Sequence, residues 1–190
     1  MNKIRVGFAM CGSFCTISKC LEQMKNLVNL NYDIIPIVSY NLFNTDTRFG
    51  KASDIIKKIE EICSKKVISC INDAEPIGPK NMTDIMLVCP CTGNTLSKLD
   101  KAITDTPVTM AVKSHLRGQK PVLLALATND ALGASAKNLG SMLNTKNFFF
   151  VPMSQDDISK KPNSLVANFE LIPKALEKAL NYKQIEPLFM

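Results

Sequence analysis

The hydrophobic residues of this chain fall into short, nearly continuous runs that alternate with segments of helical spacing. The continuous runs are rich in β-branched residues, which favour strands. They predict strands over residues 4–10, 32–39, 84–89, 121–127 and 148–151, with a weaker candidate at 67–71. Because apolar residues follow one another in these runs without strict alternation, we expect strands that are buried on both faces of a sheet.

The intervening segments repeat apolar residues every three or four positions, as one face of a helix requires. This spacing predicts helices over residues 17–28, 53–62, 108–116 and 165–180, and a further helix that runs to residue 144. Pro173 lies inside the last of these segments, and proline removes a backbone hydrogen-bond donor from a helix interior. We therefore expect the segment 165–180 to be kinked or split at Pro173.

Strands that alternate with helices indicate right-handed βαβ units and a mostly parallel sheet with helices on both faces. The sequence therefore predicts an α/β fold, a Rossmann-like or flavodoxin-like three-layer sandwich. We expect residues 1–190 to form a single domain, in which residues 152–190 supply a lid or clasp and a C-terminal helix. Ligands of such folds bind beyond the carboxyl ends of the strands, so the turns that follow strands are the candidate site.

The composition excludes several classes of protein. The 190 residues are 46% hydrophobic and 21% charged, which is typical of a folded domain and rules out a disordered, collagen-like or coiled-coil chain. No apolar run approaches the roughly 20 residues of a membrane-spanning helix, and the N-terminus has no secretory signal. We therefore expect a cytoplasmic protein that has no membrane partner.

The charge pattern argues against a nucleic-acid partner. The net charge of +6 arises from 23 basic and 17 acidic residues, and only three of the basic residues are arginines. Aromatic residues make up 6% of the chain. Nucleic-acid surfaces usually combine clustered cations with aromatic side chains on which bases stack. The mild positive excess instead favours a small anionic ligand.

The seven cysteines and the single histidine do not form a metal-binding pattern. No Cys-x-x-Cys pair occurs, and His115 is distant from every cysteine in the sequence, whereas structural zinc sites need paired ligands at short spacing. We therefore expect no metal site. A single histidine on a helix is more often structural than catalytic. Cys11 and Cys15 lie near a predicted helix start, where a thiol pKa can be depressed, but such residues are more often simply small.

The turn after the first strand contains Gly12, Ser13 and Thr16. Small and hydroxyl-bearing residues before a helix allow a phosphate to approach the free backbone N–H groups of the helix N-terminus. The turn is not a Gly-x-Gly-x-x-Gly motif, and neither that motif nor a Walker loop occurs in the chain. The alternative is a tight turn in which Ser13 caps the helix.

The connection after the second strand, residues 39–50, is long and polar, and it carries Arg48. A βα connection usually has about two to six residues, so a functional loop is a reasonable hypothesis. The guanidinium of Arg48 is suited to bind a substrate carboxylate through two parallel hydrogen bonds. The alternative is a surface ion pair between Asp46 and Arg48 that orders the loop.

Two further turns concentrate hydroxyl and amide side chains. Residues 89–95 combine a proline and a glycine with Cys91, Thr92, Asn94 and Thr95, and the backbone N–H groups of such a turn can bind an anion. Residues 127–130 carry Thr128 and Asn129 after another strand. Both turns have an alternative interpretation, in which the hydroxyl, amide and carboxylate groups cap the helices that follow.

Taken together, these turns resemble the FMN-binding flavoprotein family, which includes homo-oligomeric cysteine decarboxylases. Further segments resemble a sporulation-associated group of that family, in which the chain is one subunit of a two-subunit oxidoreductase. The resemblance extends over essentially the whole chain. Its motifs are Gly12-Ser13, Thr45–Gly50, Pro90–Thr95, Ala127–Gly133, Leu143–Asn147, Gln155–Asp157 and Lys161–Leu165.

The resemblance implies a cofactor, partners and site residues. It implies FMN, with Gly12, Ser13 and Thr16 near the phosphate. It implies a separate nicotinamide-binding subunit that carries NAD(P), a small dicarboxylate substrate, the mother cell of a sporulating bacterium, and trimers or multiples of trimers. The remaining residues of the implied cofactor pocket are Ser39, Pro90, Cys91, Thr92, Asn94, Thr95, Thr128 and Asn129.

Two departures from the decarboxylases of the family are evident. Those enzymes carry a catalytic histidine shortly before the Pro90–Thr95 turn, and residues 70–86 contain none. Their Pro-x-Met-Asn motif is replaced by Ala127–Asp130. The resemblance therefore favours an oxidoreductase subunit over a stand-alone flavin-dependent decarboxylase or prenyltransferase. A scaffold subunit that only completes the partner's active site remains the non-catalytic alternative.

Overall fold

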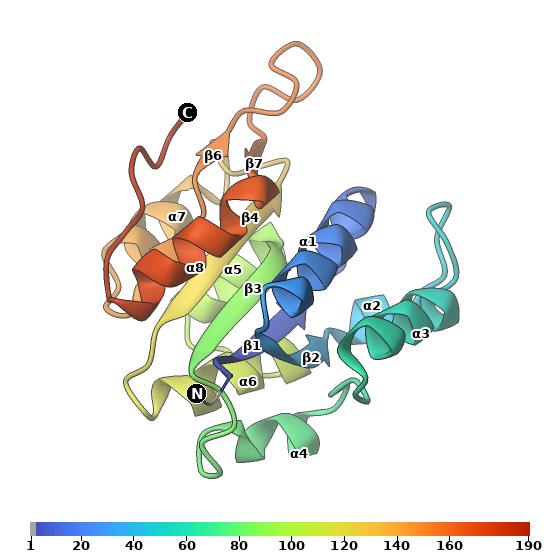
Figure 1. Cartoon of the computed structure of the whole chain (residues 1–190). Helices are drawn as coiled ribbons and strands as arrows, with labels where there is room; N and C mark the ends of the chain where they lie inside the picture. Colours follow the sequence, from blue (N-terminus) through green and yellow to red (C-terminus); the bar gives the residue numbers. More distant parts are fainter. Residues whose placement is uncertain (1–2) are drawn as a thin grey trace.

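The computed structural model describes residues 3–190 and confirms the predicted α/β fold (Figure 1). The centre of the molecule is a sheet of parallel strands in the flavodoxin-like order β2-β1-β3-β4-β5. These strands are β1 (Arg5–Met10), β2 (Asp33–Val38), β3 (Ile85–Cys91), β4 (Val122–Thr128) and β5 (Phe148–Phe150). Each one overlaps a strand predicted from the sequence, with ends displaced by at most a few residues.

Two short antiparallel strands, β6 (Met153–Ser154) and β7 (Leu165–Ala167), extend the sheet beyond β4. β5 pairs with the first half of β4, whereas β7 pairs with its last residues, Ala127 and Thr128. Residues 155–164, which connect β6 to β7, protrude from the carboxyl edge of the sheet (Figure 1). We call this connection the strap. The strap lies within residues 152–190, the segment that the sequence predicts to supply a lid or clasp and a C-terminal helix.

Helices cover both faces of the sheet (Figure 1). One apolar core lies between the sheet and α1, α3 and α8, and a second lies between the sheet and α4 to α7. The helices are α1 (Ile17–Asn29), α2 (Tyr40–Asn44), α3 (Ala52–Cys63), α4 (Ile71–Ala74), α5 (Gly93–Asp100), α6 (Pro107–Leu116), α7 (Ala136–Leu143) and α8 (Ile172–Leu180). Three short 3-10 turns, η1 (Phe14–Thr16), η2 (Glu75–Ile77) and η3 (Phe169–Leu171), adjoin α1, α4 and α8.

Two predicted elements were wrong. Residues 67–71 form no strand in the described part of the chain, because only Ile68 forms a bridge, to Ile37 at the edge of the sheet. The segment 165–180 is not one kinked helix, since its first part is β7 and η3. Pro173 is the second residue of α8, where a missing N–H costs nothing. The apolar residues Leu165 and Ala167 therefore belong to a strand, and Phe169 begins a 3-10 turn.

The strand order creates a crevice at the carboxyl edge of the sheet. β1 lies between β2 and β3, so the chain leaves β1 toward one side and leaves β3 toward the other. Such a switch point leaves room between diverging loops, and ligands of open α/β sheets bind there. No helix in the described residues is both long and apolar enough to cross a membrane.

Candidate functional site

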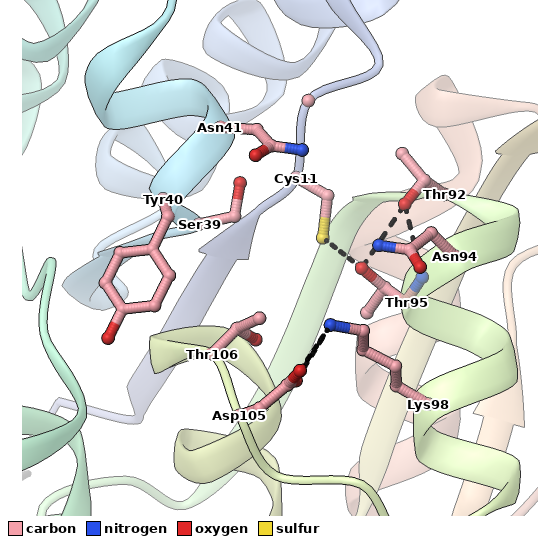
Figure 2. A pocket seen from close by; sticks show the side chains of 11 residues that line it. Cys11, Ser39, Tyr40, Asn41, Thr92, Asn94, Thr95, Lys98, Asp105 and Thr106 are labelled. Carbon is pink, nitrogen blue, oxygen red and sulfur yellow. Dashed lines mark hydrogen bonds and ion pairs between the residues drawn. The ribbon is translucent and has the colours of Figure 1, made fainter.

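Two adjoining cavities open at this carboxyl edge. The inner cavity has a volume of about 440 Å³ and lies between the ends of β1 and β3, α2, α5 and the start of α6 (Figure 2). The outer cavity has a volume of about 760 Å³ and lies between the start of α1, the loop before α3, the end of β4 and the strap. Gly12, Thr92 and Asn94 line both cavities, so the two form one continuous crevice.

Most residues predicted from the sequence meet in this crevice. Ser39 and Thr95 line the inner cavity, and the three residues named above line both. The predicted residues of the outer cavity are Ser13, Thr16, Arg48, Thr128 and Asn129. These residues come from four different turns, and the parallel sheet brings the turns together because it aligns the carboxyl ends of its strands.

Pro90 and Cys91 lie elsewhere, within β3 and outside the linings of both cavities. Both are buried, and burial raises the pKa of the Cys91 thiol well above its ordinary value. The pairing of β3 with β4 shifts register between Val88 and Cys91, as expected where a proline without an N–H interrupts a central ladder. These two residues therefore lie in the buried strand that leads into the turn, and neither contributes to the lining of a cavity.

A chain of small polar groups forms one wall of the inner cavity (Figure 2). The Cys11 thiol lies 3.1 Å from the Thr95 hydroxyl, and the Thr92 hydroxyl donates to Thr95 at 3.2 Å. Burial raises the pKa of the Cys11 thiol to about 11, so the possibility of a depressed pKa at this position was wrong. The wall is neutral at physiological pH.

Some predicted hydroxyls also cap helices. Ser39 accepts a hydrogen bond from the backbone N–H of Leu42 at the start of α2, and Thr92 accepts one from Thr95 at the start of α5. In contrast, the side chains of Asn41 and Asn94 form no hydrogen bond within residues 3–190. Their amide groups remain available to a ligand, and each can both donate and accept.

A single ion pair supplies the charge of the inner cavity. The Lys98 ammonium, on α5, lies 2.8 Å from each carboxylate oxygen of Asp105, which precedes α6 (Figure 2). The hydrogen bond from Lys98 lowers the pKa of Asp105. Lys98 is only 21% exposed, whereas Asp105 is 57% exposed. Sequence analysis missed this pair, because the two residues belong to different elements.

Three cations line the outer cavity: Lys19 from α1, Arg48 from the loop before α3, and Lys161 from the strap. Lys161 pairs with Asp156 at 2.7 Å, and this hydrogen bond raises the pKa of Lys161. Lys19 and Arg48 pair with no carboxylate in the part of the chain that the structure describes. The outer cavity thus contains two cations that have no ion-pair partner among the described residues.

The alternative interpretation of Arg48 was wrong. Asp46 does not pair with Arg48; it accepts a hydrogen bond from the backbone N–H of Ala52 at 2.8 Å and so stabilises the start of α3. The Arg48 guanidinium lies over the Phe49 ring, 4.9 Å from its centroid. Such stacking occupies the face of the guanidinium and leaves the N–H groups at its edge free to bind a carboxylate.

The carboxylate of Asp130, for which the sequence suggested only a helix-capping role, also lines the outer cavity. Asp130 accepts hydrogen bonds from the Thr128 hydroxyl at 2.5 Å and the Ser135 hydroxyl at 2.9 Å. Its expected role as a helix cap was wrong, because α7 begins only at Ala136. Gly93 permits the arrangement, since a Cβ there would lie 2.7 Å from the Thr128 hydroxyl.

In the turn after β1, the Ser13 side chain does not cap the helical turn that follows. The Ser13 side chain forms no capping hydrogen bond, and Thr16 donates its hydroxyl proton to the Ser13 carbonyl at 2.9 Å. The Ser13 hydroxyl is therefore left to the outer cavity. Thr16, in contrast, already uses its own donor.

His115 lies away from both cavities and has a structural role. It is 2% exposed on α6, with one ring nitrogen 2.7 Å from the Thr83 hydroxyl and the other 2.9 Å from the carbonyl of Pro121. Burial lowers its pKa to about 4. The structural interpretation of this histidine is confirmed. No group of residues suited to bind a metal ion occurs within residues 3–190.

Residues 1–166 of the chain match the Flavoprotein family. The chain belongs to that family. It is also 45% identical over 186 residues to the B subunit of dipicolinate synthase from Bacillus subtilis (strain 168), a match that covers 98% of this chain and 93% of that protein. The resemblance predicted from the turns is confirmed.

Solved structures of related proteins agree with the fold. The crystal structure of the dipicolinate synthase B subunit from Bacillus halodurans C superposes with a TM-score of 0.90 at 42% identity, covering 100% of this chain and 98% of that one. An FMN-dependent cysteine decarboxylase superposes with a TM-score of 0.66 at 18% identity, covering 93% of this chain and 97% of that one. The second likeness demonstrates a shared fold only.

Proposed function

We propose that this chain is the B subunit of a dipicolinate synthase. It would oxidise dihydrodipicolinate, or its hydroxylated tetrahydro precursor, to dipicolinate in the mother cell of a sporulating bacterium. The observation that carries the proposal is the paired crevice: a neutral cavity rich in hydroxyl and amide groups adjoins a cavity of net positive charge, which is lined by three cations and two carboxylates. The name of the 45% identical relative supports the same reaction.

The outer cavity suits a small dicarboxylate. The free edge of the Arg48 guanidinium can bind one carboxylate through two hydrogen bonds, and Lys19 offers a second positive charge from another wall. The ammonium of Lys161, although paired with Asp156, retains donors toward the cavity. We expect the substrate to lie here, held by Arg48 and within reach of the turn at Thr128 and Asn129.

The residues of the crevice fit FMN. The unpaired amides of Asn41 and Asn94 match the donors and acceptors at the edge of a flavin ring, and Gly12 allows close approach of the backbone. Ser13 precedes the 3-10 turn η1, which leads directly into the 13-residue helix α1, and free backbone N–H groups at the start of a helix favour a phosphate. A bound flavin would supply the capacity to accept electrons, and this chain would hold and orient it.

A second type of chain would complete the enzyme. The present chain carries no Gly-x-Gly-x-x-Gly motif, so NAD(P) is expected on the A subunit of dipicolinate synthase. The designation of the relative as the B subunit supports such a partner. We further expect this chain to form trimers, or multiples of trimers, which light scattering of the purified protein would test.

A scaffold function is the second candidate, and one observation favours it. Ser39 and Thr92 both serve as helix caps, so part of the polar wall has a structural reason to exist without any ligand. In this case the chain would only complete the active site of the partner. A stand-alone decarboxylase of the histidine-dependent type is not favoured, because the single His115 is buried far from the crevice.

The visible absorbance spectrum of the purified chain, before and after addition of FMN, separates the two candidates. We expect a flavin band, near one-to-one binding, and weaker binding by the Asn94→Ala variant. Asn181→Ala is the control, because that amide caps the end of α8 away from the crevice. Absence of a band and of binding would leave the scaffold function.

A further inference from the structure

We propose that Asp130 is the proton acceptor for a substrate bound in the outer cavity. This inference rests on the proposed function for the identity of the substrate, a partly reduced pyridine dicarboxylate. No general base could be assigned from the sequence, and neither cavity contains a histidine. The carboxylates of the two linings are therefore the natural candidates.

Asp130 differs from the other two carboxylates that line the crevice. Asp105 accepts from the ammonium of Lys98, and Asp156 accepts from the ammonium of Lys161, both in close ion pairs. Asp130 pairs with no cation among the described residues, and its partners are two neutral hydroxyls. A carboxylate paired with an ammonium is a weaker proton acceptor than one held only by neutral donors.

The hydroxyls of Thr128 and Ser135 fix the orientation of the carboxylate without occupying it. Each oxygen of Asp130 accepts one hydrogen bond, and a carboxylate offers about four lone-pair positions in all. One or more lone pairs thus remain free toward the outer cavity, which Asp130 lines. Gly93 maintains this position, because any side chain there would displace the Asp130 carboxylate, 2.9 Å from the expected Cβ.

The surrounding turn does not depend on the carboxylate. The backbone N–H groups of Gly133 and Ser135 donate to the main-chain carbonyl of Asp130 at 3.0 and 3.1 Å. Main-chain bonds therefore close the turn between β4 and α7. An amide in place of the carboxylate should keep the fold, and this separates a chemical role from a structural one.

The proposed step is a two-electron oxidation of the ring. One ring C–H bond of the dihydropyridine breaks with its electron pair, which leaves as hydride to an acceptor of the flavin or nicotinamide class. The neighbouring C–H bond releases its proton to a free lone pair of Asp130, and the electron pair of that bond becomes the new ring double bond. The ring gains aromaticity, the acceptor is reduced by two electrons, and Asp130 ends protonated and returns its proton to solvent.

The test uses the complex of both subunits with wild-type chain, Asp130→Asn and Asp130→Ala. We expect kcat to fall by about a hundredfold or more in both variants, the range of general-base catalysis. The affinity for pyridine-2,6-dicarboxylate should change much less, because the asparagine keeps the shape of the site. Added formate should restore part of the activity of Asp130→Ala. Asp54→Asn, an exposed carboxylate on α3 outside both cavities, should match wild type.

The possible outcomes distinguish a failure of the proposed role of Asp130 from a failure of the proposed function. A wild-type complex that turns over, together with a fully active Asp130→Asn variant, would overturn the role of Asp130 alone. Loss of activity in parallel with loss of the folding transition, and without rescue by formate, would also overturn it. A wild-type complex without turnover would overturn the proposed function and this inference together.

Discussion

The inner and outer cavities share three residues of one wall but are built from different chemistry. The inner cavity is formed at the ends of buried strands and of helices, and its polar groups mostly satisfy one another, as in the series from Cys11 to Thr95 to Thr92. The outer cavity is formed by loops and by the strap, and its cations Lys19 and Arg48 have no carboxylate partner in the described chain. A neutral pocket beside a charged pocket that is formed by loops suits a planar ring and a small anion.

Cysteine labelling should distinguish the cavities most strongly. Cys15 is exposed in the outer cavity, whereas Cys11 is buried in the wall of the inner cavity and its pKa is raised to about 11. Only the thiolate reacts, so we expect Cys15 to be alkylated at least about a hundredfold faster than Cys11 near neutral pH. Peptide mapping after timed addition of iodoacetamide measures both rates, and labelling of Cys11 should rise steadily as the pH approaches 11.

Equal labelling of the two cysteines in the folded chain would contradict the closed inner wall. The Cys15→Ser variant serves as the control, since it removes the fast site and leaves Cys11 as it is.

Neutralising the outer cations should affect anion binding next most strongly. We expect Arg48→Gln and Lys19→Gln each to weaken pyridine-2,6-dicarboxylate by about tenfold, the scale of one charge-assisted hydrogen bond. Calorimetric titration measures the change. Lys25→Gln is the matched control, because it removes the same charge from the same helix but lies outside both cavities.

A loss in Lys25→Gln as large as that in Lys19→Gln would mean that only the overall charge matters. The wild-type affinity should also fall as salt is added, because exposed cations are screened.

Substitution of Gly93 should disturb the outer cavity through stability. In Gly93→Ala the new Cβ meets the Thr128 hydroxyl at 2.7 Å and the Asp130 carboxylate at 2.9 Å, so one hydrogen bond must give way. We expect a loss of about 1 to 2 kcal/mol in the free energy of unfolding, measured by denaturant titration. Gly140→Ala, on exposed α7 with no atom within 4 Å of its Cβ, should instead gain up to about 1 kcal/mol.

If the two glycine variants change stability by the same amount and sign, the close approach at Gly93 is not required. The comparison is informative because both substitutions add one methyl group to a helical glycine, and only the methyl group at Gly93 meets other atoms within 4 Å.

The smallest effect concerns the wall shared by the cavities. Asn94 lines both, and Asn41 lines the inner cavity only. We expect Asn94→Ala to weaken both FMN and pyridine-2,6-dicarboxylate by about threefold to tenfold, the net value of one hydrogen bond. Asn41→Ala should weaken FMN alone. Fluorescence titration with each ligand tests this, and a dicarboxylate affinity reduced equally by both variants would show that the cavities are not distinct.

Local patterns predicted much of the scaffold. The apolar run over residues 121–127 predicts a strand, and the structure has β4 at Val122–Thr128, because strands buried on both faces of a parallel sheet have nearly uninterrupted apolar runs. The segment 67–71 is also mostly apolar, but it lies at the edge of the sheet, where only Ile68 forms a bridge. Composition alone does not reveal whether a partner strand is in register.

The capping alternatives were the least predictable, since a hydroxyl before a helix suits a cap and a ligand equally. The sequence placed Ser13, Ser39 and Thr92 in similar positions, yet Ser39 and Thr92 cap helices and Ser13 does not. The decision depends on the backbone angles at each turn, which distant packing imposes.

Local patterns in the sequence were sufficient to predict the α/β fold, the five parallel strands and the four turns that carry the site, because apolar periodicity and turn residues act over short distances. Only the tertiary structure brought Lys98 to Asp105 and set Asp130 against Gly93. It also left Arg48 without Asp46 as a partner. Contacts of this kind join residues from different elements, so they depend on how the sheet aligns those elements. A local sequence pattern does not reveal that alignment.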